Sequence, residues 1–143
     1  MRLPEIKVSY SKGEHLPKIN SLDLAIECLR EVWDLPMIEL QERVYALFLS
    51  PSMELLGWKM INAGTACETL LDQDLIIRLA LISGAKHVII SHNHPAGSNK
   101  PSKADKSTTN ELKRKMAILG LELTDHIILT SSDYYSFKEV GLV

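Results

Sequence analysis

Residues 86–97 read KHVIISHNHPAG, and this stretch determines how the rest of the chain is interpreted. Its first half is apolar and β-branched, which is typical of a strand in the middle of a sheet. Its second half places His92 and His94 two residues apart, directly before Pro and Gly residues that end a strand. Because side chains at positions i and i+2 of an extended chain point to the same side, we expect both imidazoles to lie together at the strand's end.

Helices are predicted on both sides of this strand. Apolar residues recur at helical spacing over residues 72–84 and again over residues 102–119, and a glycine ends each pattern. Near the N-terminus, residues 21–36 begin with a capping serine, carry an apolar stripe and end at a proline. We therefore expect three helices.

Further strands are predicted at residues 5–11, 43–50, 55–62, 122–130 and 134–138, with a hairpin turn between the second and third of these. The order is then strand, helix, hairpin, helix, strand, helix, strand, strand. This order predicts an α/β or α+β fold with a mixed β-sheet flanked by helices. The length of 143 residues suits a single domain, 1–143, in which the strand and helix of residues 1–39 pack on a core of residues 40–143.

Charge and cysteine content narrow the classes of function. The formal net charge is −2 and the pI about 6.2, which is low for a protein whose main task is to bind phosphate backbones. Cys28 and Cys67 lack the spacing of metal ligands and are expected to be free thiols in a reducing compartment. The N-terminus lacks a secretory pattern, and the apolar stretches are too short to cross a bilayer. We therefore expect a cytoplasmic protein without membrane contact.

Basic residues are concentrated after the histidine pair. They are Lys100, Lys103, Lys106, Lys113, Arg114 and Lys115. One interpretation is a solvated helix face, and the other is a surface that attracts an acidic partner, either nucleic acid or protein.

Two histidines and one carboxylate suggest a metal site. Asp105 follows His94 after a loop and falls in the first turn of a predicted helix. A set of His92, His94 and Asp105 would leave the fourth position of a tetrahedral Zn²⁺ ion open for water, as in catalytic zinc sites. Such a site also needs a base, and Glu42, directly before an apolar strand, is the candidate.

Each element of this pattern has a second interpretation. The histidine pair alone could be two polar loop residues. Ser102 and Asp105 have the spacing of a helix cap, in which the acidic residue interacts favourably with the helix dipole. His126, which follows Asp125 in a predicted strand, is either a partner of the site or a structural histidine.

The combined pattern resembles the zinc motif of the JAMM (MPN-type) metalloproteases, and in particular RadC-type proteins of the JAB domain class. The motifs that carry the resemblance are HNHPAG at 92–97, PSKAD at 101–105, DHII at 125–128 and YYSF at 134–137. The resemblance extends from about residue 40 to the C-terminus. It implies the cytidine-deaminase-like fold of that family.

The resemblance also implies roles for individual residues. His92, His94 and Asp105 match the zinc ligands, Ser102 matches the residue that stabilises an oxyanion, and Glu42 lies where the family has its general base. The implied reaction is hydrolysis of a peptide or isopeptide bond in an unidentified protein or peptide. Longer RadC-type proteins carry an N-terminal helix-hairpin-helix-like region, and we expect this chain to be a short form without it.

Two other functions remain open. RadC-type proteins carry a DNA-repair label, which together with the basic residues suggests a nucleic-acid-binding or nuclease-like protein. The other alternative is a binding module that keeps the fold without chemistry.

Overall fold

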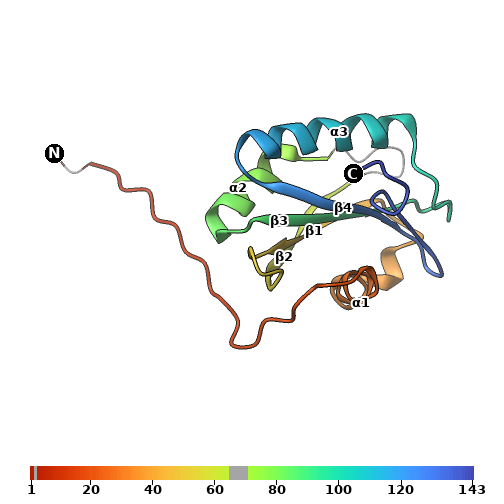
Figure 1. Cartoon of the computed structure of the whole chain (residues 1–143), viewed down its shortest axis with the longest axis horizontal. Helices are drawn as coiled ribbons and strands as arrows, with labels where there is room; N and C mark the ends of the chain where they lie inside the picture. Colours follow the sequence, from red (N-terminus) through yellow and green to blue (C-terminus); the bar gives the residue numbers. More distant parts are fainter. Residues whose placement is uncertain (2, 65–70) are drawn as a thin grey trace.

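A computed structural model describes residues 1, 3–64 and 71–143 of the chain, and it contains one mixed sheet (Figure 1). In chain order the elements are α1 (Leu22–Val32), the 3-10 helix η1 (Leu35–Met37), β1 (Arg43–Leu49), β2 (Leu55–Ala63), α2 (Gln73–Ser83), β3 (His87–Asn93), α3 (Lys103–Ile118), β4 (Glu122–Leu129) and β5 (Tyr134–Ser136). The strand order in the sheet is β2-β1-β3-β4-β5. Strands β3 and β4 are parallel, and the other neighbouring strands are antiparallel. The predicted α+β fold with a mixed sheet is confirmed.

The parallel pair follows from the helix between its strands. Helix α3 returns the chain from the end of β3 to the start of β4, which is the crossover that a parallel pair requires. Register pairs His92 with Ile128 and Asn93 with Leu129, so β3 extends through both residues. His92 is therefore held within the sheet rather than in a loop.

Apolar side chains form a core on each face of the sheet. Val88 and Ile90 pack with α2 and α3 residues such as Ile76 and Leu112. Ile89, on the opposite face of β3, packs with α1 residues including Leu29. Figure 1 shows the same division, with α2 and α3 on one side of the sheet and α1 on the other. Because both strands are buried on both faces, β1 is apolar at nearly every position and β3 has a continuous apolar run at residues 88–90.

The predicted helix starts and the glycine stop of α2 agree with the structure, whereas α1 ends at Val32 and the predicted end at Pro36 falls in η1. Ser21 caps α1 by accepting from the Leu24 amide, and Asp72 caps α2 by accepting from the Leu75 amide. Gly84 ends α2 with a φ of 71°, the left-handed conformation that glycine adopts without steric cost.

The strand predicted at residues 5–11 is wrong. These residues have no regular structure and are exposed, although apolar residues alternate there. The Tyr10 hydroxyl donates to the Leu56 carbonyl of β2, but backbone pairing with the β-structure begins only at Lys18, which forms an isolated bridge with Glu54. An extended segment without a neighbouring strand leaves its backbone groups to water, so alternation alone does not make it a strand.

The sequence analysis also predicted free thiols and apolar stretches too short to cross a bilayer. Cys28 is a free thiol, whereas Cys67 lies outside the described residues. No helix within residues 1, 3–64 and 71–143 is long and apolar enough to cross a bilayer.

Candidate metal centre

His92, His94 and Asp105 meet where β3 ends and α3 begins. The Nε2 atoms of the two histidines are 2.9 Å apart. Asp105 Oδ1 lies 3.5 Å from His92 Nε2, and Oδ2 lies 3.2 Å from His94 Nε2. One potential ligand atom from each residue thus falls within 4.8 Å of the other two. The structure brings together the three residues that the sequence pattern singled out.

Asp105 is placed by the first turn of α3. Ser102 Oγ accepts a hydrogen bond from the Asp105 amide at 3.0 Å, and Asp105 Oδ2 accepts one from the Ser102 amide at 2.8 Å. This reciprocal pair is a capping box, so the capping interpretation of Ser102 and Asp105 is confirmed. The same carboxylate also faces His94, and capping therefore orients Asp105 toward the histidines rather than competing with that role.

The residues of this cluster shift one another's pKa values. Burial raises the pKa of the Asp105 carboxyl, but interactions with His92 and His94 outweigh it and hold this pKa well below its usual range. The hydrogen bond to Asp105 raises the pKa of His94, while burial acts in the opposite sense. A metal ion bound by these residues would compete with protons for the same imidazole nitrogens and carboxylate oxygens.

Glu42 lies within electrostatic reach of the same cluster. Its pKa is raised mainly by burial, while electrostatic interactions with His92 and His94 lower it and the interaction with Asp105 raises it. The Glu42 carbonyl accepts from the Gly64 amide, which joins the residue before β1 to the end of β2. The structure therefore brings Glu42 near the histidines and Asp105.

Asn93 connects the segment that carries Glu42 to the histidine pair, a role that sequence reasoning missed. Its amide nitrogen donates to the carbonyls of Ile38 at 2.6 Å and Gln41 at 2.9 Å, and its oxygen accepts from the Arg43 amide at 2.8 Å. Asn93 is fully buried. Because a buried side-chain amide must be hydrogen-bonded, its burial explains this role, but no signal in the sequence shows that burial or its partners.

His126 and Thr109 lie behind His92 in the core. His126 Nε2 is 2.6 Å from His92 Nδ1, and its Nδ1 is 2.6 Å from Thr109 Oγ1. Desolvation, followed by electrostatic interaction with His92, lowers the pKa of His126 well below its ordinary value. Of the two interpretations of His126, the structure favours contact with the site, whereas Thr109 was not predicted.

The six basic residues of the sequence analysis are exposed along the loop and α3. Lys115 pairs with Glu111 one helical turn away. Three buried residues, Thr109, Leu112 and Met116, define the opposite face of this helix. Their exposure is compatible with both interpretations, a solvated helix face and a surface that attracts an acidic partner.

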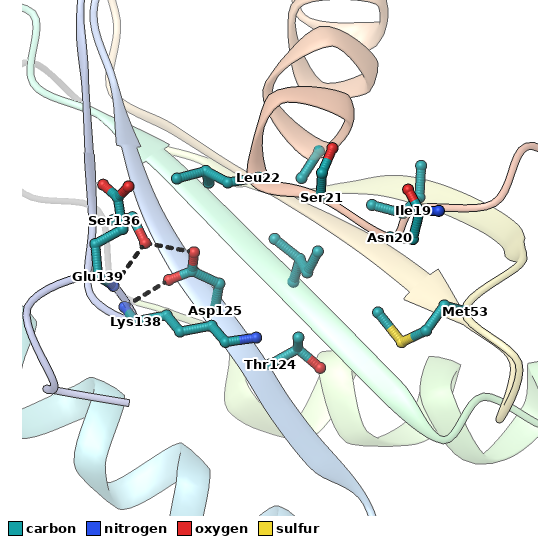
Figure 2. Close-up of a pocket in the computed structure, with 12 residues that line it drawn as sticks. Ile19, Asn20, Ser21, Leu22, Met53, Thr124, Asp125, Ser136, Lys138 and Glu139 are labelled. Atoms are coloured by element: carbon teal, nitrogen blue, oxygen red, sulfur yellow. Dashed lines mark hydrogen bonds between the residues drawn. The ribbon is translucent and has the colours of Figure 1, made fainter.

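A separate pocket of about 580 Å³ lies on the α1 face of the sheet (Figure 2). Its lining includes Ile19, Met53, Ile89, Asp125 and Lys138, and none of the three clustered residues. The metal cluster belongs to the opposite face, because His92 shares the side of β3 that carries Ile90.

Comparison with known proteins agrees with the motifs. A family model described as a RadC-like JAB domain matches residues 19–142. A UPF0758 protein of Aquifex aeolicus is 33% identical over 141 residues, covering 99% of this chain and 59% of that protein. UPF0758 proteins of Thermotoga maritima and Acaryochloris marina are 32% and 40% identical, covering 90% and 72% of this chain and 56% and 42% of their own lengths. This chain thus spans about half the length of these relatives, and it belongs to the RadC-like JAB domain family.

Proposed function

We propose that this protein is a metal-dependent hydrolase of the JAMM type, which holds Zn²⁺ with His92, His94 and Asp105 and cleaves a peptide or isopeptide bond. One observation carries the proposal. Two imidazole nitrogens and a carboxylate converge on one point at the end of a buried strand.

The chemistry of these donors fits a zinc ion. His94 Nδ1 is 2.9 Å from the Ser98 carbonyl, which can only accept, so Nδ1 carries the hydrogen and Nε2 faces the cluster. Two nitrogens and one carboxylate leave a coordination position open, as in catalytic rather than structural zinc sites. A zinc ion bound there would polarise a substrate carbonyl and lower the pKa of a water molecule.

Glu42 and Ser102 supply the remaining functions. A carboxylate whose pKa is raised by burial can take a proton from water and deliver it to a leaving amine. Ser102 Oγ accepts from the Asp105 amide, which leaves its own hydrogen to donate to an oxyanion beside the cluster. Glu42 and Ser102 therefore act beside the metal position, while the three ligands hold the ion.

A nuclease-like protein and a non-catalytic binding module would each require a different set of residues at the cluster. Nuclease-type two-metal sites use several bridging carboxylates, whereas Asp105 is the single carboxylate in the cluster identified among the described residues. A non-catalytic module would not need a carboxylate beside the cluster, where Glu42 lies.

The test combines zinc content with hydrolysis. The purified chain, supplied with zinc, should bind about one ion, and both His94→Ala and Asp105→Ala should lose it. Glu42→Gln should keep the zinc and lose hydrolysis of a peptide library, and His87→Ala, a β3 histidine outside the cluster, should behave as wild type. Absence of zinc binding by the wild type would overturn the proposal. Zinc without hydrolysis of any peptide or isopeptide substrate would favour the binding module.

A further inference from the structure

A buried chain of hydrogen bonds joins His92 to the backbone of Asp105. It runs from His92 Nδ1 to His126 Nε2 over 2.6 Å, and from His126 Nδ1 to Thr109 Oγ1 over 2.6 Å. Thr109 Oγ1 then lies 2.5 Å from the Asp105 carbonyl oxygen. The exposed fractions of His92, His126 and Thr109 are 4%, 3% and 1%, so these hydrogen bonds are shielded from bulk solvent.

The donor and the acceptor of every hydrogen bond in this chain follow from its last acceptor, the Asp105 carbonyl oxygen. The Asp105 carbonyl can only accept, so the single hydroxyl hydrogen of Thr109 points to it. Thr109 Oγ1 must then accept from His126, which places a hydrogen on His126 Nδ1. In a neutral imidazole the other nitrogen is an acceptor, so His126 Nε2 accepts from His92 Nδ1.

His126 is held neutral by its surroundings. Its ring stacks on Phe137 with the ring centroids 4.5 Å apart, and Phe137 is fully buried. Within the described residues, its ring nitrogens form hydrogen bonds to His92 and Thr109 and to no carboxylate. A charged imidazolium would lose its hydration there without an anionic partner in return.

We propose that His126 and Thr109 are positioning residues that fix the hydrogen of His92 on Nδ1 and thereby direct the Nε2 lone pair at the metal position. The proposal rests on the metal site proposed above, but it concerns the state of the chain before any metal binds. The opposite tautomer of His92 would place a hydrogen on Nε2, where it would block coordination.

The hydrogen is fixed on Nδ1 in a different way at each of the two histidine ligands. At His94 the fixing acceptor is the Ser98 carbonyl, in a loop at the surface. At His92 no carbonyl takes this role directly, and the Asp105 carbonyl acts through Thr109 and His126. Ligating histidines generally donate their second N–H to an acceptor that fixes their tautomer, and here the acceptor belongs to another ligand residue.

The first measurement is the tautomer of each histidine in the metal-free chain. Long-range ¹H–¹⁵N correlation spectra of the ¹⁵N-histidine-labelled protein distinguish the two neutral forms and the charged form. We expect His92 and His126 to be neutral with the hydrogen on Nδ1. A hydrogen on Nε2 of His92, or a doubly protonated His126, would overturn the proposal.

The second measurement uses matched variants. Thr109→Val removes the hydroxyl at nearly unchanged shape, and Thr109→Ser retains it. We expect Thr109→Val to shift His92 toward the Nε2–H form and to weaken zinc binding about tenfold or more, as loss of such partners does. Thr109→Ser should stay near wild type in both respects.

His126 offers a second pair of variants. His126→Leu removes both hydrogen bonds and should weaken zinc binding by about 10–100-fold. His126→Gln should recover most of this loss, because its amide can accept from His92 and donate to Thr109. His87→Leu, the same substitution at a β3 histidine outside the cluster, is the control, and thermal unfolding of each metal-free variant shows that it is folded.

The two proposals fail in different ways. If the wild type binds no zinc, the proposed function fails, while the metal-free spectra still test the hydrogen-bond chain. If the wild type binds zinc but Thr109→Val and His126→Leu bind it equally tightly with an unchanged His92 tautomer, the site stands and the positioning role is refuted.

Discussion

Asp125 is expected to stabilise the attachment of the C-terminal segment to β4. Its Oδ1 accepts from the amides of His126 at 2.7 Å and Lys138 at 3.0 Å, and its Oδ2 accepts from the Ser136 hydroxyl at 2.6 Å (Figure 2). Asp125 is 4% exposed and Ser136 2%. These bonds surround Phe137, whose ring packs on His126.

Asp125→Ala would leave three donors without their acceptor. An unsatisfied buried donor costs about 1–3 kcal/mol. The Ser136 hydroxyl can rotate and the Lys138 amide is only part-buried, so the full sum does not apply. We expect the free energy of unfolding to fall by about 2–4 kcal/mol, a large effect for a single substitution.

Asp125→Asn is the matched control. Its amide oxygen can accept from both backbone amides, and its NH₂ group can donate to Ser136 Oγ, so the loss should stay below about 1 kcal/mol. Urea unfolding followed by tryptophan fluorescence measures both variants, since Trp33 is buried in the α1 core. Equal stability of Asp125→Ala and Asp125→Asn would refute the reasoning, because it would mean that the three bonds contribute nothing.

The remaining predictions concern pH and charge. Burial raises the pKa of Asp125 above its ordinary value, although hydrogen bonds from Ser136 and Lys138 oppose the shift. The folded state therefore binds this proton more tightly than the unfolded chain does. Protonation of Asp125 therefore adds to the free energy of unfolding. This addition is complete below the unfolded pKa of about 3.9 and is lost as the pH rises through the folded-state pKa. The stability of the wild type relative to Asp125→Asn should accordingly decline across that range in urea titrations, and a difference that grows with pH would contradict this. For the basic residues, the combined Lys103→Gln, Lys106→Gln and Lys113→Gln variant should leave zinc affinity unchanged, because these side chains lie on the exposed face of α3. If the wild type bound DNA with a salt dependence that this variant reduced by about three phosphate contacts, the nucleic-acid alternative would be favoured instead.

Local patterns in the sequence determined the regular elements and the metal cluster. Apolar periodicity, capping residues and terminal glycines depend on neighbours a few residues apart, so they placed α2 and α3 within a residue at each end and located the start of α1, although α1 ends four residues before the predicted Pro36. The same holds for His92 and His94, whose spacing on an extended chain places both side chains together.

Only the tertiary structure decided the contacts between distant segments. Asn93 meets a carbonyl 55 positions away, and His126 meets His92 across 34 positions, so no local pattern could reveal either partner. The predicted strand at residues 5–11 failed for the same reason, because a strand exists through its hydrogen bonds to another strand. The sequence by itself therefore determined which residues could bind a metal, whereas the fold decided which buried groups orient them, since a hydrogen bond depends on distance and direction in space.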